Sequence, residues 1–321
     1  MTYHILVPDS VHPRAVDVLK SASGLNFTAP GQMTRAELLA ALPEADALII
    51  RSASKIDAEA LAAAPKLKMI ARAGVGVDNV DIPDATARGI VIMNTPDGNT
   101  VSTAEHTFGL MLALARHIPQ AHASMREGKW DRKSYMGVEL RGKTLGVVGF
   151  GRIGRAVAKR ALAFDMHVIA FDPYIPADVA ADLGAELVSL DDLFARADFI
   201  TLHALLTDET REMINKTSLA TMKKGVRIVD AARGALINEA DLAEAIKSGQ
   251  VAGAALDVFA QEPPPPDNPL VGLPGVVHTP HLAASTDDAQ IVVAVEAAQL
   301  VVDALTTGEY RNVLNPAALS K

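Results

Sequence analysis

The clearest chemical pattern in the sequence is a set of glycines with the spacing that binds the pyrophosphate of a dinucleotide. Gly149, Gly151 and Gly154 follow the apolar run 145–148 and open a helical pattern over residues 152–164. In such a turn the first glycine permits a tight bend, the second lets the backbone approach the phosphates, and the third lets the helix lie close to the strand. The N-terminus of the helix then offers N–H groups to the phosphates. The pattern therefore predicts a dinucleotide site.

A carboxylate after the next predicted strand indicates which dinucleotide binds there. Asp172 follows the strand-like run 167–171, downstream of Gly154. A carboxylate at this point accepts hydrogen bonds from the adenosine ribose and repels the additional phosphate of NADP. A glycine-rich turn with a capping aspartate would explain the same residues without a cofactor. The order of strand, glycines, helix, strand and acid favours NAD.

Such a site needs a parallel sheet to position it, and short apolar runs alternate with helical patterns along the whole chain. Runs of this kind are typical of buried parallel strands. Helices are predicted in the first half over Pro13–Lys20, Thr34–Ala41 and Asp57–Ala63. We expect two series of βα units. The predicted strands are His4–Val7, Ala47–Ile50, Lys68–Ala71 and Ile90–Met93 in the first series, and Leu145–Val148, His167–Phe171, Phe199–Leu202, Val226–Val229, Val251–Leu256 and Val276–His278 in the second.

Helix ends and long helices give further expectations. Asn238 is expected to cap a helix that ends at Gly249. Long apolar helices are predicted over residues 102–117 and 286–305. From the pattern alone, these two helices either bridge two domains or are ordinary core helices.

Composition restricts the classes of function. The length of 321 residues is typical of two domains, and the net charge of −8 disfavours a general nucleic-acid or membrane-surface binder. There is no cysteine, so disulfides and cysteine-ligated zinc are excluded, and redox chemistry would need a cofactor. Residues 1–8 lack the layout of a signal peptide, and the apolar run 108–115 is shorter than the ~20 residues that span a bilayer. We expect a cytoplasmic protein with no nucleic-acid partner, no membrane partner and no metal.

Six further motifs occur together with the glycine turn: RAGVGVDNVD at 72–81, MNTPDGNT at 93–100, DAARG at 230–234, GAALDVF at 253–259, EP at 262–263 and TPHLAAST at 279–286. With these motifs in this order, the chain resembles the D-isomer-specific 2-hydroxyacid dehydrogenases over nearly its whole length, and within that family the D-3-phosphoglycerate dehydrogenases most closely.

The resemblance implies an α/β fold of two Rossmann-like parallel-sheet domains with an interdomain cleft. The substrate-binding domain would be discontinuous, residues 1–98 plus 286–321, and the NAD-binding Rossmann domain would span residues 99–285. This arrangement favours the bridging role for the two long helices. Members of the family are usually homodimers. Many phosphoglycerate dehydrogenases carry a further C-terminal regulatory domain; since this sequence stops at Lys321, we expect neither that domain nor feedback control by serine through it.

Three residues of these motifs would carry the reaction. The resemblance implies that Arg233 binds the substrate carboxylate. A guanidinium binds a carboxylate in a forked geometry and can polarise the adjacent carbonyl. His281 would accept and return the hydroxyl proton, because imidazole titrates near physiological pH. Glu262 would orient His281 and favour its protonated form. Taken singly, each of these residue types is more often an ordinary surface or core residue.

The resemblance also implies a set of cofactor-binding residues. Asp257 would contact the nicotinamide amide, unless it is a strand-end turn residue. Two positions depart from the family pattern: Ala283 stands where glycine is frequent and Leu205 where proline is common. These departures leave the fine geometry beside the nicotinamide open. The set is Gly149, Gly151, Arg152, Ile153, Gly154, Asp172, Thr210, Ala231, Asp257 and His281.

Arginines outside the three catalytic candidates point to the substrate. Arg51 and Arg72 follow predicted strands, where α/β domains place ligand-binding residues, and Gly74 and Val75 lie in the loop after Arg72. They resemble the substrate-phosphate contacts of the phosphoglycerate dehydrogenases. Arg132 resembles a residue that reaches the site of the partner subunit. Such a cluster of cations in an acidic chain predicts a small anionic substrate, with 3-phosphoglycerate and 3-phosphohydroxypyruvate as the favoured pair.

Two alternatives stay open at this point. A related enzyme could reduce hydroxypyruvate, glyoxylate or sulfopyruvate, because a sulfonate presents three oxygens much as a phosphate does. A protein of another class, an NAD(H)-sensing corepressor-like binding protein, uses the same fold and can keep the arginine, glutamate and histidine. Turnover of NADH with a 2-keto acid would separate an enzyme from a sensor.

Overall fold

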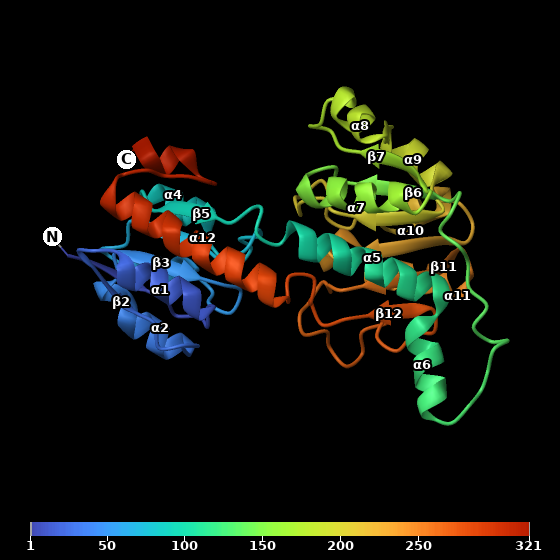
Figure 1. The fold of residues 1–321 in the computed structure, drawn as a ribbon, viewed down its shortest axis with the longest axis horizontal. Helices are drawn as coiled ribbons and strands as arrows, with labels where there is room; N and C mark the ends of the chain where they lie inside the picture. The colour runs from blue at the N-terminus through green and yellow to red at the C-terminus, as the bar shows by residue number, and fades with distance from the viewer. Residues whose placement is uncertain (1, 321) are drawn as a thin grey trace. The chain divides into compact units, whose positions relative to one another are not determined.

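Two parallel sheets organise the chain in a computed structural model that describes residues 2–320. Met1 and Lys321, the outer ends of the predicted domain ranges, lie outside the described residues. The chain divides into two compact units, Met1–Asn99 with Thr286–Lys321, and Thr100–Ser285. Each unit has one sheet with helices on both faces (Figure 1). The prediction of an α/β fold with two parallel-sheet units is confirmed.

The first unit contains a five-stranded parallel sheet in the order β2-β1-β3-β4-β5. Alternate side chains of its strands point into two apolar cores, as the twofold period of a strand requires. Helices α1 and α12 cover one face, and α2, α3 and α4 contribute to the core on the other. The strands are β1 Tyr3–Leu6, β2 Leu25–Thr28, β3 Ala47–Ile50, β4 Met69–Arg72 and β5 Val91–Asn94; the helices are α1 Pro13–Ser21, α2 Arg35–Ala41, α3 Ala58–Ala62, α4 Ile82–Ala87 and α12 Asp287–Thr306, with short 3-10 turns at Leu42–Glu44 and Pro316–Ser320.

The second unit contains a seven-stranded parallel sheet in the order β12-β11-β10-β9-β6-β7-β8. Helices α5, α7 and α8 pack on one face and α9, α10 and α11 on the other. The strands are β6 Thr144–Val148, β7 His167–Phe171, β8 Glu186–Leu187, β9 Phe199–Leu202, β10 Val226–Asp230, β11 Val251–Leu256 and β12 Val276–His278; the helices are α5 Thr100–Arg116, α6 Ile118–Arg126, α7 Arg152–Ala163, α8 Ala177–Leu183, α9 Leu190–Arg196, α10 Lys216–Thr221 and α11 Glu239–Lys247, with a 3-10 turn at Gly234–Leu236.

The predicted elements agree closely with these bounds, and local capping explains several of the ends. Thr34 caps α2 in a reciprocal capping box with Glu37, and Asp57 caps α3, so both residues precede the helices predicted to include them. Asn238 caps α11 by accepting from Asp241 N at 3.0 Å, as predicted. The sequence pattern did not predict β2, because this edge strand is only half buried and carries no continuous apolar run.

The two long apolar helices are core helices, each within one unit. Helix α5 packs against α7 and β11 of the second unit, and α12 packs against α1 and β4 of the first. The bridging role that the resemblance favours for these helices stays a prediction. By length and by a mean hydropathy of 1.5, α12 could also cross a membrane, but its residues Val293, Ala297 and Val301 are buried against the five-stranded sheet.

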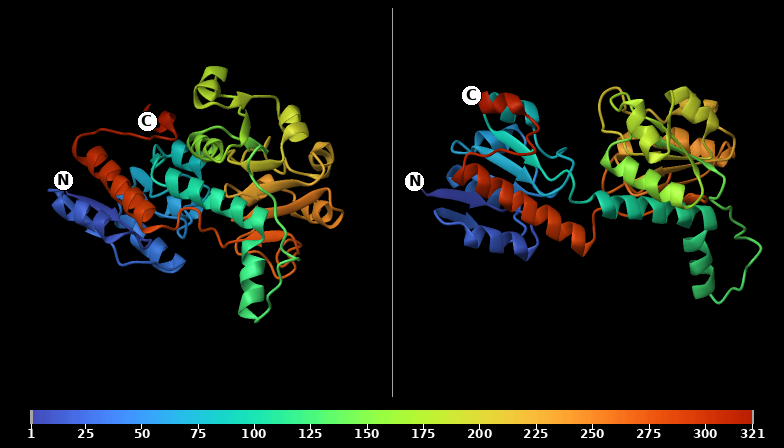
Figure 2. Two further views of the ribbon diagram at one scale, coloured as in Figure 1. Left: turned by 45° about the vertical axis from the view of Figure 1, so that its right-hand side comes forward. Right: turned by 45° about the horizontal axis from the view of Figure 1, so that its top comes forward.

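One segment of the second unit extends from its body. Helix α6 and the chain that directly follows it project beyond the layers of the unit in all three views (Figures 1 and 2), and the chain returns to the core at Leu140, before β6. Trp130 and Met136 in this segment are 77% and 82% exposed. Large apolar side chains gathered on one exposed segment can mark a surface that contacts another protein.

Candidate active site

The glycine turn between β6 and α7 has the geometry of a dinucleotide cradle. Gly149 adopts φ +88°, and a Cβ there would lie 2.6 Å from the backbone nitrogen of Ala204. A Cβ on Gly154 would run into the carbonyl oxygen of Gly149. Around Gly151, by contrast, nothing lies within 4 Å of the place a Cβ would take. Gly149 and Gly154 thus serve close backbone packing, while Gly151 leaves open space at the helix N-terminus where a pyrophosphate fits.

Asp172 closes this cradle from the end of β7. Its carboxylate accepts hydrogen bonds from Phe150 N at 2.8 Å and from Tyr174 N at 2.9 Å. One oxygen is therefore tied to the glycine turn itself. Each carboxylate oxygen has lone pairs beyond these bonds, so Asp172 can still accept from ribose hydroxyls. Asp172 thus stands next to the glycine turn, as the prediction of a ribose contact requires.

The remaining cofactor candidates lie on neighbouring loops. Arg152 and Ile153 form the first turn of α7, and Ala231 directly follows β10. Thr210 braces the loop after β9, donating its hydroxyl to the carbonyl of Leu205 at 2.6 Å. The side chain of Leu205, which stands where the family often has proline, is 78% exposed. The loop is thus held in place by Thr210 rather than by a proline ring.

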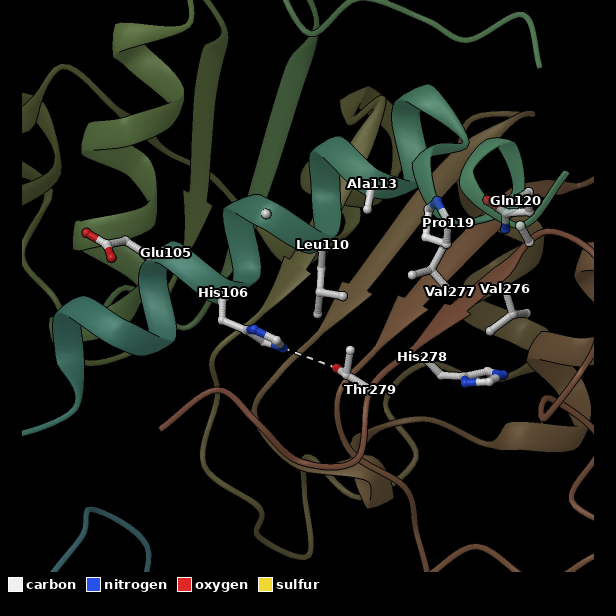
Figure 3. A pocket seen from close by; sticks show the side chains of 12 residues that line it. Glu105, His106, Leu110, Ala113, Pro119, Gln120, Val276, Val277, His278 and Thr279 are labelled. Carbon is white, nitrogen blue, oxygen red and sulfur yellow. Dashed lines mark hydrogen bonds between the residues drawn. The ribbon is translucent and has the colours of Figure 1, made fainter. Parts of the chain in front are cut away.

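Asp257 organises the loop after β12. It is fully buried and accepts hydrogen bonds from the backbone N–H groups of Leu282 and Ala283, both at 2.8 Å, and from the Thr279 hydroxyl at 2.5 Å. His106 on α5 lies 3.1 Å from both Asp257 and Thr279, and its ring points toward Thr279 in Figure 3. Burial raises the pKa of Asp257, but these hydrogen bonds outweigh it and hold the pKa below its usual range. Bracing of the loop is therefore its observed structural role.

His281 and Glu262 form a hydrogen-bonded pair on the loops after β12 and β11. The His281 Nδ1 lies 2.6 Å from Glu262 Oε2, and the other carboxylate oxygen accepts from Phe259 N at 3.1 Å. The bond with Glu262 raises the pKa of His281, more than burial lowers it. Burial raises the pKa of Glu262, but the bonds from His281 and Phe259 bring it below the usual value. With Nδ1 held by the carboxylate, Nε2 is the atom left to exchange a proton with a substrate.

Arg233 directly follows the turn at the end of β10. Its Nη1 donates to the carbonyl of Ala232 at 2.7 Å, and its charge lowers the pKa of His281. Asp230 supports the turn by accepting from Ala232 N at 2.8 Å. The second unit thus brings Arg233, Glu262 and His281 together at the carboxyl edge of its sheet.

Asp230 is a buried acid in this turn that sequence analysis did not single out. Its Oδ2 is buried without a hydrogen-bond partner among the described residues, and burial raises its pKa to about 7. The acid lies in the same DAARG motif as Arg233, but only burial distinguishes it from an ordinary strand-end aspartate. Sequence analysis also missed the contacts of His106 and Thr279 with Asp257. These residues lie 151 and 22 positions from Asp257, and neither residue type indicates so distant a partner.

The substrate candidates of the first unit lie at the carboxyl edge of the five-stranded sheet. Arg51 follows β3 and Arg72 ends β4. The loop after Arg72 is held by β5, because Gly74 N donates to the Thr95 hydroxyl at 2.8 Å and Val75 O accepts from the Asn94 side chain at 2.6 Å. The structure therefore brings four predicted substrate residues to one edge of one sheet.

Arg132 lies elsewhere, in the exposed segment between α6 and β6 rather than in the loops that carry Arg233 and His281. No group of three or more His, Asp or Glu side chains among residues 2–320 could hold a metal ion. The chemistry available at the described edges is therefore that of a guanidinium, an imidazole–carboxylate pair and a dinucleotide cradle.

Comparison with known proteins agrees with this geometry. Residues 108–283 match the family model described as D-isomer specific 2-hydroxyacid dehydrogenase, NAD binding domain. A D-3-phosphoglycerate dehydrogenase of Archaeoglobus fulgidus is 50% identical over 97% of this chain, which spans 59% of that relative's length. Among solved structures, a Thermus thermophilus protein has 38% identity and a TM-score of 0.89, covering 97% of this chain and 99% of its own. A glyoxylate reductase from Paecilomyes thermophila has 31% identity, the same TM-score, and coverage of 98% and 99%.

Proposed function

The chain belongs to the D-isomer-specific 2-hydroxyacid dehydrogenase family, and we propose that it is an NAD-dependent enzyme that interconverts a D-2-hydroxy acid and its 2-keto acid. The observation that carries this proposal is the pairing of His281 with Glu262 at 2.6 Å beside Arg233, in the same unit as the glycine cradle. A corepressor-like sensor can keep the same three residues, so turnover of NADH with a 2-keto acid is the observation that separates an enzyme from a sensor.

Each residue of this group has a distinct task in the proposed reaction. NAD, when bound in the cradle, supplies the acceptor for the hydride that leaves C2 of the hydroxy acid. Arg233 binds the substrate carboxylate and polarises the carbonyl that forms. His281 Nε2 accepts the hydroxyl proton during oxidation and returns it during reduction. Glu262 keeps Nδ1 protonated and directed away, so that Nε2 faces the reacting oxygen.

The cofactor residues would divide the dinucleotide between them. Gly151, Arg152 and Ile153 at the first turn of α7 would hold the pyrophosphate, and Asp172 the ribose. Thr210, Ala231 and Asp257 would line the side toward the nicotinamide. Asp172, which Phe150 N holds at the end of β7, would repel the 2′-phosphate of NADP and so supports NAD.

For the substrate we propose 3-phosphoglycerate and 3-phosphohydroxypyruvate. Arg51 and Arg72 would bind the distal phosphate together with the loop at Gly74 and Val75, since a dianion with three oxygens matches two forked cations. The curated relatives at about 50% identity bear the name D-3-phosphoglycerate dehydrogenase, which supports this choice. Reduction of glyoxylate, hydroxypyruvate or 3-sulfopyruvate is the second candidate, because solved structures of similar fold include glyoxylate reductases.

A panel of initial rates tests the proposal. NADH oxidation would be compared with 3-phosphohydroxypyruvate, hydroxypyruvate, glyoxylate and 3-sulfopyruvate at equal concentrations. We expect the highest kcat/KM for 3-phosphohydroxypyruvate. In Arg51→Ala, kcat/KM should fall for this substrate and not for the other acids. A higher kcat/KM for hydroxypyruvate would overturn the phosphate assignment but keep the reaction class. The absence of turnover with every acid, despite NADH binding, would favour the corepressor-like sensor.

We also propose that the enzyme is a cytoplasmic homodimer, formed through α5, α6 and the exposed segment after α6. A groove of about 740 Å³ lies between α5, α6 and β12, lined by apolar side chains such as Leu110, Ala113 and Val277 (Figure 3). Exposed Trp130 and Met136 supply apolar groups of the kind that fill such a groove in a second copy. Arg132 would then approach the partner's substrate.

The oligomeric state tests this assembly directly. Sedimentation equilibrium should give twice the chain mass, and Trp130→Glu with Met136→Glu should give the monomer. A monomeric wild type would contradict the proposal. If the dimer forms, Arg132→Ala should weaken binding of the phosphorylated substrate without dissociating the dimer.

A further inference from the structure

The loop Arg51–Ser54, at the carboxyl edge of the five-stranded sheet, is held from both sides by two side chains. On one side is Asp9, which is 2% exposed. Its Oδ2 accepts from Arg51 N at 2.5 Å and Ser54 N at 3.4 Å, and its Oδ1 accepts from the Ser54 hydroxyl at 2.5 Å. Asp9 thus binds the N–H groups at both ends of this short loop.

On the other side is Asn79. Its amide nitrogen donates to the carbonyls of Arg51 at 2.7 Å and Ser54 at 2.6 Å. Its amide oxygen accepts from Arg72 Nε at 3.0 Å. Only this orientation of the amide is satisfied, because the reverse would set the oxygen against two carbonyls and the NH2 group against a guanidinium. Asn79 therefore links the backbone that carries Arg51 to the side chain of Arg72.

The guanidinium of Arg72 also lies close to Gly74. A Cβ on Gly74 would lie 2.5 Å from Arg72 Nη1, so the guanidinium lies directly over this glycine. Gly74 has φ +148°, which favours glycine in any case. Asn79 therefore holds Arg72 at its Nε, and glycine at residue 74 leaves room for the guanidinium.

The chemistry of residue 79 suits an anion site. An amide both donates to two carbonyls and accepts from a guanidinium while adding no charge. A carboxylate could accept from Arg72 but could not donate to Arg51 and Ser54, and its negative charge would oppose a nearby anion. Asp9 differs from residue 79 because its oxygens accept from backbone and hydroxyl donors of the loop and are not needed to donate.

We propose that Asn79 is a positioning and specificity-determining residue that sets the spacing of Arg51 and Arg72, and thereby the preference for substrates with a distal anion. This inference rests on the proposed function for the identity of the substrate, though not for the existence of the anion site. Asn79 itself would not contact the anion; it acts through the Arg51 backbone and Arg72 Nε.

The kinetic test compares 3-phosphohydroxypyruvate with hydroxypyruvate in Asn79→Ala, with Asn26→Ala on the exposed face of β2 as the matched control. The selectivity measured is kcat/KM for 3-phosphohydroxypyruvate divided by kcat/KM for hydroxypyruvate. Because Asn79→Ala loses a hydrogen bond to a charged group, this ratio should fall by about tenfold or more. The fall should come from a higher KM for the phosphorylated acid. The kcat for hydroxypyruvate should stay within about threefold of the wild-type value. Asn79→Asp should lower the ratio further. An unchanged ratio in Asn79→Ala would overturn the inference.

A double-mutant cycle excludes a merely structural role. If Asn79 acts through the arginine, Asn79→Ala should add little to the loss of phosphate selectivity in Arg72→Ala. Equal losses in both backgrounds would show that Asn79 does not act through Arg72, and would count against the proposal.

A binding measurement separates this inference from the proposed function. Inorganic phosphate should raise the Tm of the wild type more than that of Asn79→Ala, whether or not the protein turns over any keto acid. If the wild type is inactive but this difference appears, the proposed function fails and the inference stands. If the wild type is active on the phosphorylated acid and phosphate raises both Tm values equally, the function stands and the inference fails. The inference also fails if phosphate does not stabilise the wild type.

Discussion

The carboxyl edge of the seven-stranded sheet carries the hydrogen-bonded pair of His281 and Glu262, whereas the same edge of the five-stranded sheet carries the guanidinium groups of Arg51 and Arg72. In the former, the surroundings shift the pKa of His281 upward, that of Glu262 downward and that of Asp230 to about 7. In the latter, Asp9 and Asn79 hold a loop and an arginine by hydrogen bonds. The difference implies that rate and pH dependence reside in one unit and selectivity for a distal anion in the other.

The largest expected effect is that of His281→Asn. Removing a positioned acid–base group typically costs ~10²–10⁴-fold in rate. We expect kcat to fall by that order while the Kd for NADH, measured by fluorescence titration, stays near the wild-type value. His167→Asn, at the exposed start of β7, is the matched control. Near-normal turnover in His281→Asn would break the division between the two units, because the proton would then have to be carried elsewhere.

Arg233→Lys is expected to come next. Lysine keeps the charge but cannot form the forked contact, so both kcat and the affinity for substrate should fall, together by roughly 10–100-fold. The exposed Arg211→Lys should change neither. If only KM rose, Arg233 would be a binding residue of the same kind as Arg51 and Arg72, and the contrast in chemistry between the two edges would be weaker.

A smaller effect is expected from Asp172→Ser. Loss of the carboxylate removes the repulsion of a 2′-phosphate and should narrow the NAD preference by about tenfold, equivalent to ~1.4 kcal/mol. The measurement is kcat/KM with NAD and with NADP, and Asp178→Ser on α8 serves as the control. A wild type that already uses both cofactors equally would contradict the role of Asp172.

The smallest change in maximal rate, but the most informative about pH, is expected from Glu262→Gln. Because the bond with Glu262 raises the pKa of His281, its loss should lower that pKa. Reduction of the keto acid requires protonated His281. As pH rises, the rate of reduction should therefore fall at a lower pH in the variant than in the wild type. The pH profile of kcat measures this, with Glu244→Gln on α11 as the control.

The same pair affects stability with a defined sign. The folded-state pKa of His281 is raised, so its contribution to the free energy of unfolding is fully present below the unfolded pKa and is lost as pH rises through the folded one. Glu262→Gln should flatten this dependence in denaturant titrations. Variants of Asn79 in the other unit should leave both pH profiles unchanged, and a shift there would remove the distinction between the two edges.

Much of the fold was predictable because it depends on interactions between residues near one another in the sequence. Buried parallel strands require continuous apolar runs, so β3, β9 and β11 were predicted at their observed bounds. The predicted cap of α11 depends on two residues three positions apart, Asn238 and Asp241. The glycine spacing of the cofactor turn is likewise local. The half-buried edge strand β2 had no such signal.

The tertiary structure alone decided which polar groups meet. His106 reaches Asp257 across 151 positions, Glu262 reaches His281 across 19, and Asn79 reaches Arg51 across 28. Residue types and motifs indicated that His281 and Arg51 bind or react, but the pKa of one and the placement of the other depend on neighbours that only the folded sheets supply. Chain folding brings the carboxyl ends of parallel strands to one edge, and there desolvation and hydrogen bonding, which have no counterpart in the extended sequence, set the chemistry of each group.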